Sequence, residues 1–120
     1  GAFHTAVEVF GVEWSYGYIP DPENTGLTGI FWCLPGECEA HGYRENIHMG
    51  NTSLTESQVN DLLDELRGHW KSQEYDMLRQ NCCHFSDALC VRLGVGHMPA
   101  WINNLAAAGA TVGDGLKQLL

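Results

Sequence analysis

Residues 79–90 read RQNCCHFSDALC, a stretch that combines the start of a helix with two adjacent thiols. Asn81 is a favoured N-cap residue, and the apolar residues behind it recur at the spacing of one helix face. Gly94 suits the left-handed position that often ends a helix. The pattern therefore predicts a helix from about Asn81 to Gly94, with Cys82 at its first position.

The two cysteines have different predicted surroundings on a helical wheel. Cys82 falls on the core-facing stripe one turn before Phe85, whereas Cys83 falls nearly opposite, on the side of Asp87 and Cys90. We expect Cys82 to point to the seam between helix and sheet and Cys83 to point away from it.

The predicted position of Cys82 favours nucleophilic chemistry. Unpaired N–H groups and the positive end of the helix dipole stabilise a thiolate there, and the same N–H groups stabilise an oxyanion during acyl transfer. A cysteine hydrolase also needs an imidazole base.

Six histidines are available as that base: His4, His41, His48, His69, His84 and His97. His84 projects to the other side of the helix from Cys82 and is a poor candidate. His4 lies in a predicted strand, which could present it at the Cys82 seam. The residues alone leave His4 and His48 as the better candidates, with His4 slightly ahead.

Short strands are expected in the first part of the chain, where β-branched and aromatic residues are frequent. We place them at about 3–10, 12–16, 29–33 and 43–49. Gly11 indicates a tight turn or bulge between the first two. The run at 18–29 is dense in Pro, Asn and Gly, which predicts an exposed loop.

Helices are expected in the second part. Apolar residues from Val59 to Trp70 follow helical spacing and predict a helix over about 55–72. Its capping box is either Ser53 with Glu56 or Thr55 with Gln58. Pro99 suits the first position of a third helix, which carries Trp101, Ile102 and Leu105. Strands followed by helices predict a single α+β domain over residues 1–120, with a flexible glycine-containing tail at 110–120.

Composition narrows the function classes. A hydrophobic content of 44% is enough for one core, and the net charge of −9, from 15 acidic against 6 basic residues, argues against nucleic-acid binding. No apolar run is long enough to span a membrane, and the chain opens without the features of a secretory leader. We therefore expect a cytoplasmic protein, with the nucleus as a second location, and cysteines that are mostly free.

A zinc site is the main alternative for the cysteines. Cys33, Cys38 and His41 form C-x4-C-x2-H, which Cys82 and Cys83 would complete. Structural zinc prefers tighter knuckles, and adjacent cysteines rarely ligate one ion with good geometry. We expect no metal and no cofactor, and no strained Cys82–Cys83 disulfide.

Three segments resemble, in order, signatures of the PPPDE superfamily: FHTAVEVFGVEWSYG, QNCCHFSDAL and MPAWINNLA. Members are permuted papain-fold cysteine peptidases, also called DeSI-like isopeptidases. The resemblance covers about residues 2–109 and implies a small antiparallel sheet packed against a helical subdomain. It also implies that Cys82 is the nucleophile and His4 its general base, with Asn81 and Cys83 beside the site.

Two departures from the family pattern stand out. Cys83 occupies a position where the family usually has Asn. The sequence begins three residues before His4, where the family normally has a preceding strand. Either that strand has been trimmed from this sequence or the sheet lacks an edge strand, and its loss would leave His4 near a frayed end and less firmly positioned.

The resemblance implies an isopeptidase that removes SUMO or ubiquitin from target proteins, its partners being the modifier and the conjugated protein. Alternatives are a protein depalmitoylase with the same dyad, since a Cys–His pair also cleaves thioesters, and a non-catalytic binding module with the same fold. We expect the Cys82 N–H and an unassigned side-chain amide to hold the oxyanion. Trp14, Tyr16 and Trp32 are candidates for lining an apolar cleft, although such aromatic residues more often belong to the core.

Overall fold

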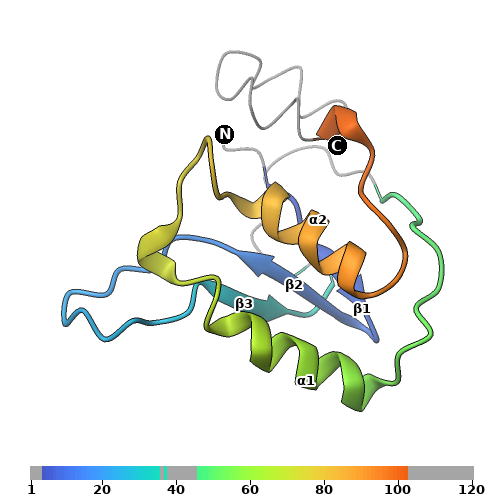
Figure 1. Ribbon diagram of the computed structural model, residues 1–120, viewed down its shortest axis with the longest axis horizontal. Helices are drawn as coiled ribbons and strands as arrows, with labels where there is room; N and C mark the ends of the chain where they lie inside the picture. Colours follow the sequence, from blue (N-terminus) through green and yellow to red (C-terminus); the bar gives the residue numbers. More distant parts are fainter. Residues whose placement is uncertain (1–3, 36, 38–45, 103–120) are drawn as a thin grey trace.

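The structure, a computed structural model, describes residues 4–35, 37 and 46–102 (Figure 1). Its elements are, in chain order, β1 (Val7–Val9), β2 (Val12–Tyr16), β3 (Ile30–Cys33), α1 (Glu56–Arg67), the short 3-10 helix η1 (Ser72–Glu74) and α2 (Cys82–Arg92). The strands form one antiparallel sheet in the order β1-β2-β3, so that β2 is central. This is the α+β arrangement that the sequence predicts.

The hairpin between β1 and β2 turns at Phe10 and Gly11, whose φ angles of 50° and 73° are both positive. Two positive φ angles in a two-residue loop match the right-handed twist of the flanking strands. The predicted turn is therefore confirmed. The first strand is shorter than predicted, because residues 4–6 lie outside the sheet and pairing begins at Val7.

The strand predicted over 43–49 is wrong for its described part, since residues 46–49 form no strand. Ile47 and Met49 nevertheless pack against buried residues of α2 and of the segment after it. The alternation of apolar and polar residues in this segment arises because Ile47 and Met49 face the buried cluster, although the segment pairs with no strand among the described residues. The predicted loop at 18–29 is confirmed apart from a single bridge at Thr28.

The long helix α1 begins as predicted. Thr55 is its N-cap, and Thr55 and Gln58 exchange both hydrogen bonds of a capping box, so this pair is the right one of the two alternatives. The helix ends at Arg67, five residues before the predicted end. There the Gly68 N–H turns back to the Leu66 carbonyl, and the chain continues into η1, which the sequence did not predict.

One hydrophobic cluster joins the sheet to both helices, and Tyr16 lies at its centre with no exposed surface. Its ring centroid lies 5.1 Å from that of Trp70, 5.2 Å from that of Tyr75 and 6.1 Å from that of Phe85. Such contacts add to the stabilisation that area burial provides. Figure 1 shows α2 lying along β1 and β2. The start of α2 is thus anchored, through Phe85 and Tyr75, to the central strand.

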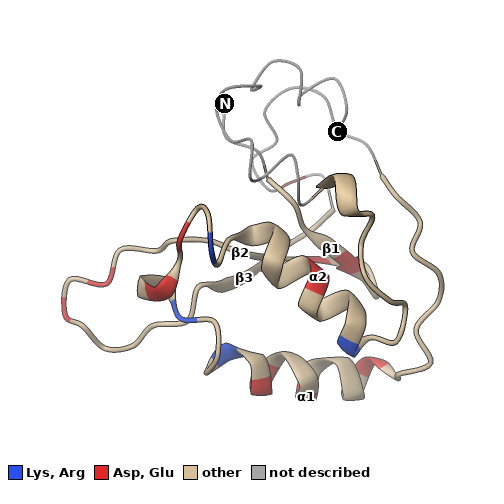
Figure 2. Ribbon diagram, turned by 45° about the horizontal axis from the view of Figure 1, so that its top comes forward, with Lys and Arg blue, Asp and Glu red and all other residues tan. Residues whose placement is uncertain are grey.

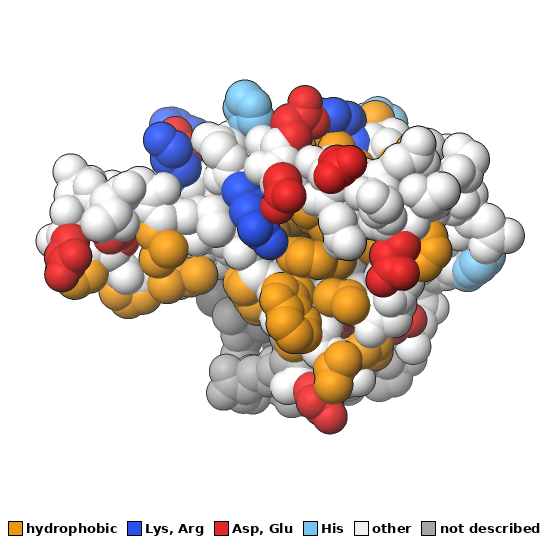
Figure 3. Space-filling view, turned by 90° about the horizontal axis from the view of Figure 1, so that it is seen from below, with side chains coloured by type: hydrophobic (Ala, Val, Ile, Leu, Met, Phe, Trp, Pro, Cys, Tyr) orange, Lys and Arg blue, Asp and Glu red, His pale blue; other side chains and the backbone are white. Residues whose placement is uncertain are grey.

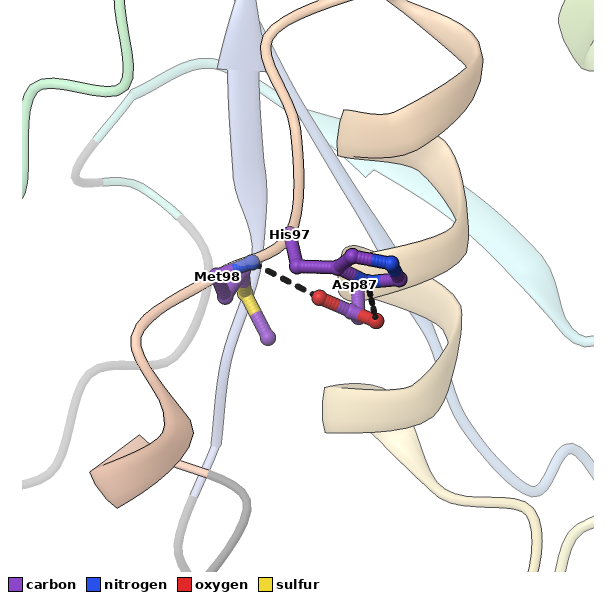
Figure 4. A network of polar contacts seen from close by, with 3 residues as sticks. All are labelled: Asp87, His97 and Met98. Carbon is purple, nitrogen blue, oxygen red and sulfur yellow. Dashed lines mark hydrogen bonds and ion pairs between the residues drawn. The ribbon is translucent and has the colours of Figure 1, made fainter.

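The segment after α2 is tied to that helix by Asp87 (Figure 4). One carboxylate oxygen of Asp87 lies 2.8 Å from Nδ1 of His97, and the other accepts a 2.7 Å hydrogen bond from the Met98 N–H. Residues 100–102 are helical, and the Ile102 N–H bonds to the Pro99 carbonyl, which confirms the predicted helix start. Leu105 and the tail at 110–120 lie outside the described residues.

Acidic residues are spread over several elements of the structure (Figure 2). The exposed side of α1 carries Glu56, Asp61, Asp64 and Glu65, whereas the first turn of α2 has no acidic residue. In the described part of the chain, no helix is long and apolar enough to cross a membrane.

Candidate active site

The first turn of α2 is fixed by its cap. The Asn81 side-chain oxygen accepts hydrogen bonds from the N–H groups of Cys83, at 2.9 Å, and His84, at 3.2 Å. In return, Nδ1 of His84 accepts a 3.0 Å hydrogen bond from the Asn81 N–H. This capping box places Cys82 at the first helical position, as the sequence predicts. Because Nδ1 of His84 is used in this cap, His84 has a structural role at the helix start.

Cys82 is buried, and its side chain is hydrogen-bonded to the ring of His4. A hydrogen bond from the Cys83 thiol is the largest influence on its pKa and lowers it. Burial opposes this, while the hydrogen bond and charge of His4 and a hydrogen bond from the Thr5 backbone act in the same direction as Cys83. Together they lower the pKa of the Cys82 thiol to about 4. Such a thiol is a thiolate at neutral pH, which is the nucleophilic form.

His4 reaches Cys82 from the segment that precedes β1. Its Nε2 lies 2.9 Å from the hydroxyl of Ser15 on β2. Its ring stacks on Phe31 of β3, with centroids 6.4 Å apart and planes inclined by 20°. Because Ser15 and Phe31 are paired residues of neighbouring strands, one spot on the sheet holds the imidazole from two sides. Only one feature of the sequence points to Ser15, namely a hydroxyl side chain between two aromatic residues of a strand.

The predicted orientation of Cys83 is wrong. Its side chain has no exposed surface, and its sulfur lies 3.0 Å from the Thr5 hydroxyl and within hydrogen-bonding reach of Cys82. The hydrogen bond to Cys82, followed by burial, raises the pKa of Cys83 well above its ordinary value. A helical wheel takes account of the residues of one helix only. In the folded protein, Thr5 in the segment before β1 covers the side of α2 on which Cys83 lies. Cys83 is thus a neutral donor to the Cys82 thiolate.

Tyr75 is a neighbour of Cys82 that the sequence analysis missed. Its hydroxyl makes hydrogen bonds with both the backbone and the side chain of Cys82. Burial, followed by the charge of Cys82, raises the pKa of Tyr75 to about 12, so its hydroxyl stays a proton donor at neutral pH. Tyr75 comes directly after η1, a 3-10 helix with no clear apolar periodicity to reveal it.

The side-chain groups of Asn81 mainly hold the helix start. Its amide nitrogen donates a 2.7 Å hydrogen bond to the Met77 carbonyl, and its oxygen accepts the cap hydrogen bonds. The nitrogen has a second N–H, so Asn81 at the oxyanion position stays a prediction. Beside the Cys82 sulfur, the Cys82 N–H and the Tyr75 hydroxyl are hydrogen-bonded to each other, and the hydroxyl also bonds to the sulfur.

The remaining described histidines lie elsewhere. His48 is exposed, because its neighbours Ile47 and Met49 turn towards the buried cluster around Cys82 and His48 turns away. His69 is exposed after the end of α1, and His97 pairs with Asp87. Of the two better candidates from the sequence, the structure brings only His4 to Cys82.

The aromatic residues expected along a cleft are divided between core and surface. Trp14 and Tyr16 belong to the hydrophobic cluster, and the Tyr16 hydroxyl donates to the Lys71 carbonyl, so neither faces a cleft. Trp32, by contrast, is 58% exposed on the edge strand β3, and Leu34 follows it at 51%. Figure 3 shows one face of the molecule on which hydrophobic side chains gather between acidic ones.

The zinc alternative loses one of its ligands, because Cys33 is disulfide-bonded. The expectation of mostly free cysteines holds for Cys82, Cys83 and Cys90 but not for Cys33. Cys38 and His41 lie outside the described residues. Within the described ranges, no group of three or more His, Cys, Asp or Glu side chains is arranged to hold a metal ion.

Comparison with known proteins places the chain in a family. Residues 1–118 match the PPPDE putative peptidase domain. A DeSI-like protein of Arabidopsis thaliana is 28% identical over 92% of this chain and 47% of its own length. A desumoylating isopeptidase 1 homolog of Caenorhabditis elegans is 33% identical over 93% of this chain and 34% of its own length.

A DeSI-like protein of Schizosaccharomyces pombe is 28% identical over 91% of this chain and 53% of its own length. The chain thus spans between about a third and about a half of the curated relatives it matches. No solved structure matches it. The match over residues 1–118 nevertheless covers nearly all of the sequence, and the chain belongs to the PPPDE family of putative peptidase domains.

Proposed function

We propose that this domain is a cysteine isopeptidase that removes SUMO or ubiquitin from target proteins, with Cys82 as nucleophile and His4 as general acid and base. The observation that carries the proposal is the hydrogen bond between His4 and a helix-start thiol whose pKa is lowered to about 4. A thiolate beside a protonated imidazole is the resting form of a cysteine hydrolase.

In the first step the Cys82 thiolate attacks the carbonyl carbon of the isopeptide bond, and the electron pair of the C=O double bond moves to oxygen. The Cys82 N–H and the Tyr75 hydroxyl are the donors that we assign to this oxyanion, because both lie beside the sulfur. As the oxyanion forms, they exchange their present hydrogen bonds, to each other and to the sulfur, for bonds to it. His4 then gives its proton to the lysine nitrogen as the C–N bond breaks. A thioester remains on Cys82.

In the second step His4, now neutral, takes a proton from water, and the resulting hydroxide attacks the thioester. The C–S bond breaks, and the modifier leaves as a carboxylic acid that gives its proton to solvent. Cys82 is again a thiolate beside a protonated His4. No cofactor enters either step. Cys83 would support the thiolate throughout, because its own raised pKa keeps it a thiol.

The name of the Caenorhabditis elegans relative supports SUMO as the modifier, and the choice between SUMO and ubiquitin is tested directly. The protein is incubated with SUMO and with ubiquitin that carry a C-terminal electrophile, and the labelled residue is identified by mass spectrometry. Labelling of Cys82 by SUMO, lost in Cys82→Ala and in His4→Ala and kept in Cys83→Ala, is the expected result.

Labelling lost only in Cys83→Ala would overturn the assignment of the nucleophile. Labelling by ubiquitin alone would move the substrate from SUMO to ubiquitin. An acyl-thioester probe hydrolysed without labelling by either modifier would instead identify a depalmitoylase. A protein that reacts with none of these reagents would be a binding module.

A further inference from the structure

We propose that Ser15 is a positioning residue that holds the imidazole of His4 with one ring nitrogen towards Cys82, which extends the dyad to an ordered chain from Cys82 through His4 to Ser15. This inference rests on the proposed function, since it describes how the base of that site is oriented.

His4 needs such a partner because its backbone is not part of the sheet. Pairing between β1 and β2 begins at Val7, three residues after His4, and residues 4–6 form no regular element. The side chain of His4 is also exposed rather than enclosed by the core. Its orientation therefore depends on the contacts that its ring makes, namely those with Cys82, Ser15 and Phe31.

Ser15 is well suited to fix the ring. It lies in the central strand β2, is paired with Phe31, and has no exposed surface. Buried hydroxyls occur in proteins mainly where they are hydrogen-bonded, and the partners of this one are His4, at 2.9 Å, and the Thr5 carbonyl, at 3.4 Å. Phe31 supports one face of the same ring, so the imidazole has an edge contact and a face contact on one rigid surface.

The donor and acceptor of each hydrogen bond show which ring nitrogen of His4 faces Ser15 and which faces Cys82. A carbonyl only accepts, so the Ser15 hydroxyl donates to Thr5 and offers its lone pair to His4. Nε2 of His4 then carries a hydrogen and donates it to Ser15. That leaves Nδ1 as the nitrogen that exchanges its proton with Cys82. The ring nitrogen that works as base in catalysis is commonly selected by the hydrogen bond that the other nitrogen makes.

The series of hydrogen bonds from Cys82 through His4 to Ser15 also favours the charged form of the site, in which a Cys82 thiolate lies beside a protonated His4. When His4 is protonated, both ring N–H groups have acceptors, the Cys82 thiolate on one side and the Ser15 oxygen on the other. Without the Ser15 oxygen, the Nε2–H at a partly buried contact has no acceptor on the sheet. The imidazolium is then less stable, fewer molecules carry the thiolate, and the ring is free to rotate.

The test compares Ser15→Thr with Ser15→Val, two β-branched side chains of the same shape, of which only Thr keeps the hydroxyl. The readout that needs no substrate is the rate of Cys82 alkylation by iodoacetamide at pH 5, followed by peptide mass spectrometry. The second readout is kcat and KM for a fluorogenic C-terminal amide of SUMO or ubiquitin, whichever labels Cys82.

We expect Ser15→Val to lower kcat by about 10- to 100-fold, the range of a lost hydrogen bond to a charged group, with KM little changed. The same loss should raise the pKa of Cys82 by about one to two units, which lowers its alkylation rate at pH 5 by about 2- to 10-fold. Ser15→Thr should retain most of both rates. Ser86→Ala is the matched control: Ser86 is also fully buried, but its hydroxyl has no hydrogen-bond partner among the described residues. Its removal should change neither rate.

Equal rates for Ser15→Val and Ser15→Thr would overturn the inference. If Ser15→Val lacks the circular dichroism spectrum of the folded protein, Ser15→Ala replaces it, because Ala adds no atoms. Failure of the proposed function looks different: Cys82→Ala and His4→Ala would then hydrolyse the fluorogenic amide as fast as the wild type. A loss of alkylation in Ser15→Val without any hydrolysis by the wild type would support the positioning role and reject the substrate.

Discussion

Helices α1 and α2 both begin with a capping box, but the surroundings of the two capping boxes differ. Each has a capping box, formed by Thr55 with Gln58 at α1 and by Asn81 with His84 at α2. At α1 the cap is exposed and an acidic residue, Glu56, occupies the first turn. At α2 the cap residue Asn81 is buried, and no acidic residue occupies the first turn.

The difference shows how one element of structure takes on different roles. An acidic residue at an exposed helix start interacts favourably with the helix dipole and adds a few tenths of a kcal/mol, roughly, to stability. At α2 the negative charge is the Cys82 thiolate, which the dipole, the Cys83 thiol and His4 stabilise together. The start of α1 serves folding alone, whereas the start of α2 also produces a reactive group.

The largest predicted effect comes from removing the imidazole at the start of α2. His4→Ala should lower kcat/KM for the fluorogenic modifier amide by about 10²- to 10⁴-fold, the usual contribution of a positioned acid–base group. His48→Ala removes an exposed histidine that points away from the Cys82 cluster and should leave the rate unchanged. A similar loss in both variants would contradict the choice of His4.

The caps themselves give the second comparison. Asn81→Ala leaves two N–H groups of α2 without their acceptor and should lower the free energy of unfolding by about 2 kcal/mol, the upper end for a cap. Thr55→Ala removes a single acceptor at the exposed start of α1 and should cost about 1 kcal/mol. Urea denaturation measures both values.

The two cap variants should differ more in reactivity than in stability. Alkylation of Cys82 at pH 5 should slow in Asn81→Ala, because the first turn that carries the thiolate loosens and the pKa of Cys82 rises, and should be unaffected in Thr55→Ala. Equal alkylation rates in the two variants would show that the cap of α2 has no part in activating Cys82.

The smallest predicted effect concerns the second thiol of the pair. Cys83→Ala removes the donor that most lowers the pKa of Cys82, so that pKa should rise and the thiolate fraction at pH 5 should fall. We expect alkylation of Cys82 at pH 5 to slow by about twofold for a rise of one pKa unit and by about tenfold for a rise of two, because pH 5 lies only about one unit above the present pKa. Cys90→Ala also removes a buried thiol from α2 and should leave the rate unchanged.

The sequence predicts those features of the fold that depend on neighbouring residues. The start of α1 at the Thr55 cap, the start of α2 after Asn81 and the positive φ of 84° at Gly94 all follow from local rules of helix capping. The hairpin turn at Gly11 has the same character. These signals lie within a few residues of the feature that they specify, so they can be recognised in the sequence without knowledge of the fold.

The features that the sequence did not reveal depend on residues far apart in the chain. Cys83 is buried because Thr5, 78 positions earlier, covers it, and a helical wheel contains no such information. Ser15 and Tyr75 reach the site from β2 and from the end of η1, which only the folded chain brings together. Resemblance to a family, rather than spacing, supplied the choice of His4 over His48.

The central claim is that the start of α2 holds Cys82 as a thiolate, and a pH titration of its alkylation by iodoacetamide tests it most directly. A pKa lowered to about 4 means that the thiolate forms as pH rises through 4, so the rate should climb there and be level from about pH 6 to pH 8. Cys90, whose pKa burial raises to about 11, should stay unreactive in that range. A Cys82 rate that is negligible at pH 6 and rises only near pH 9, as for an ordinary thiol, would contradict the account.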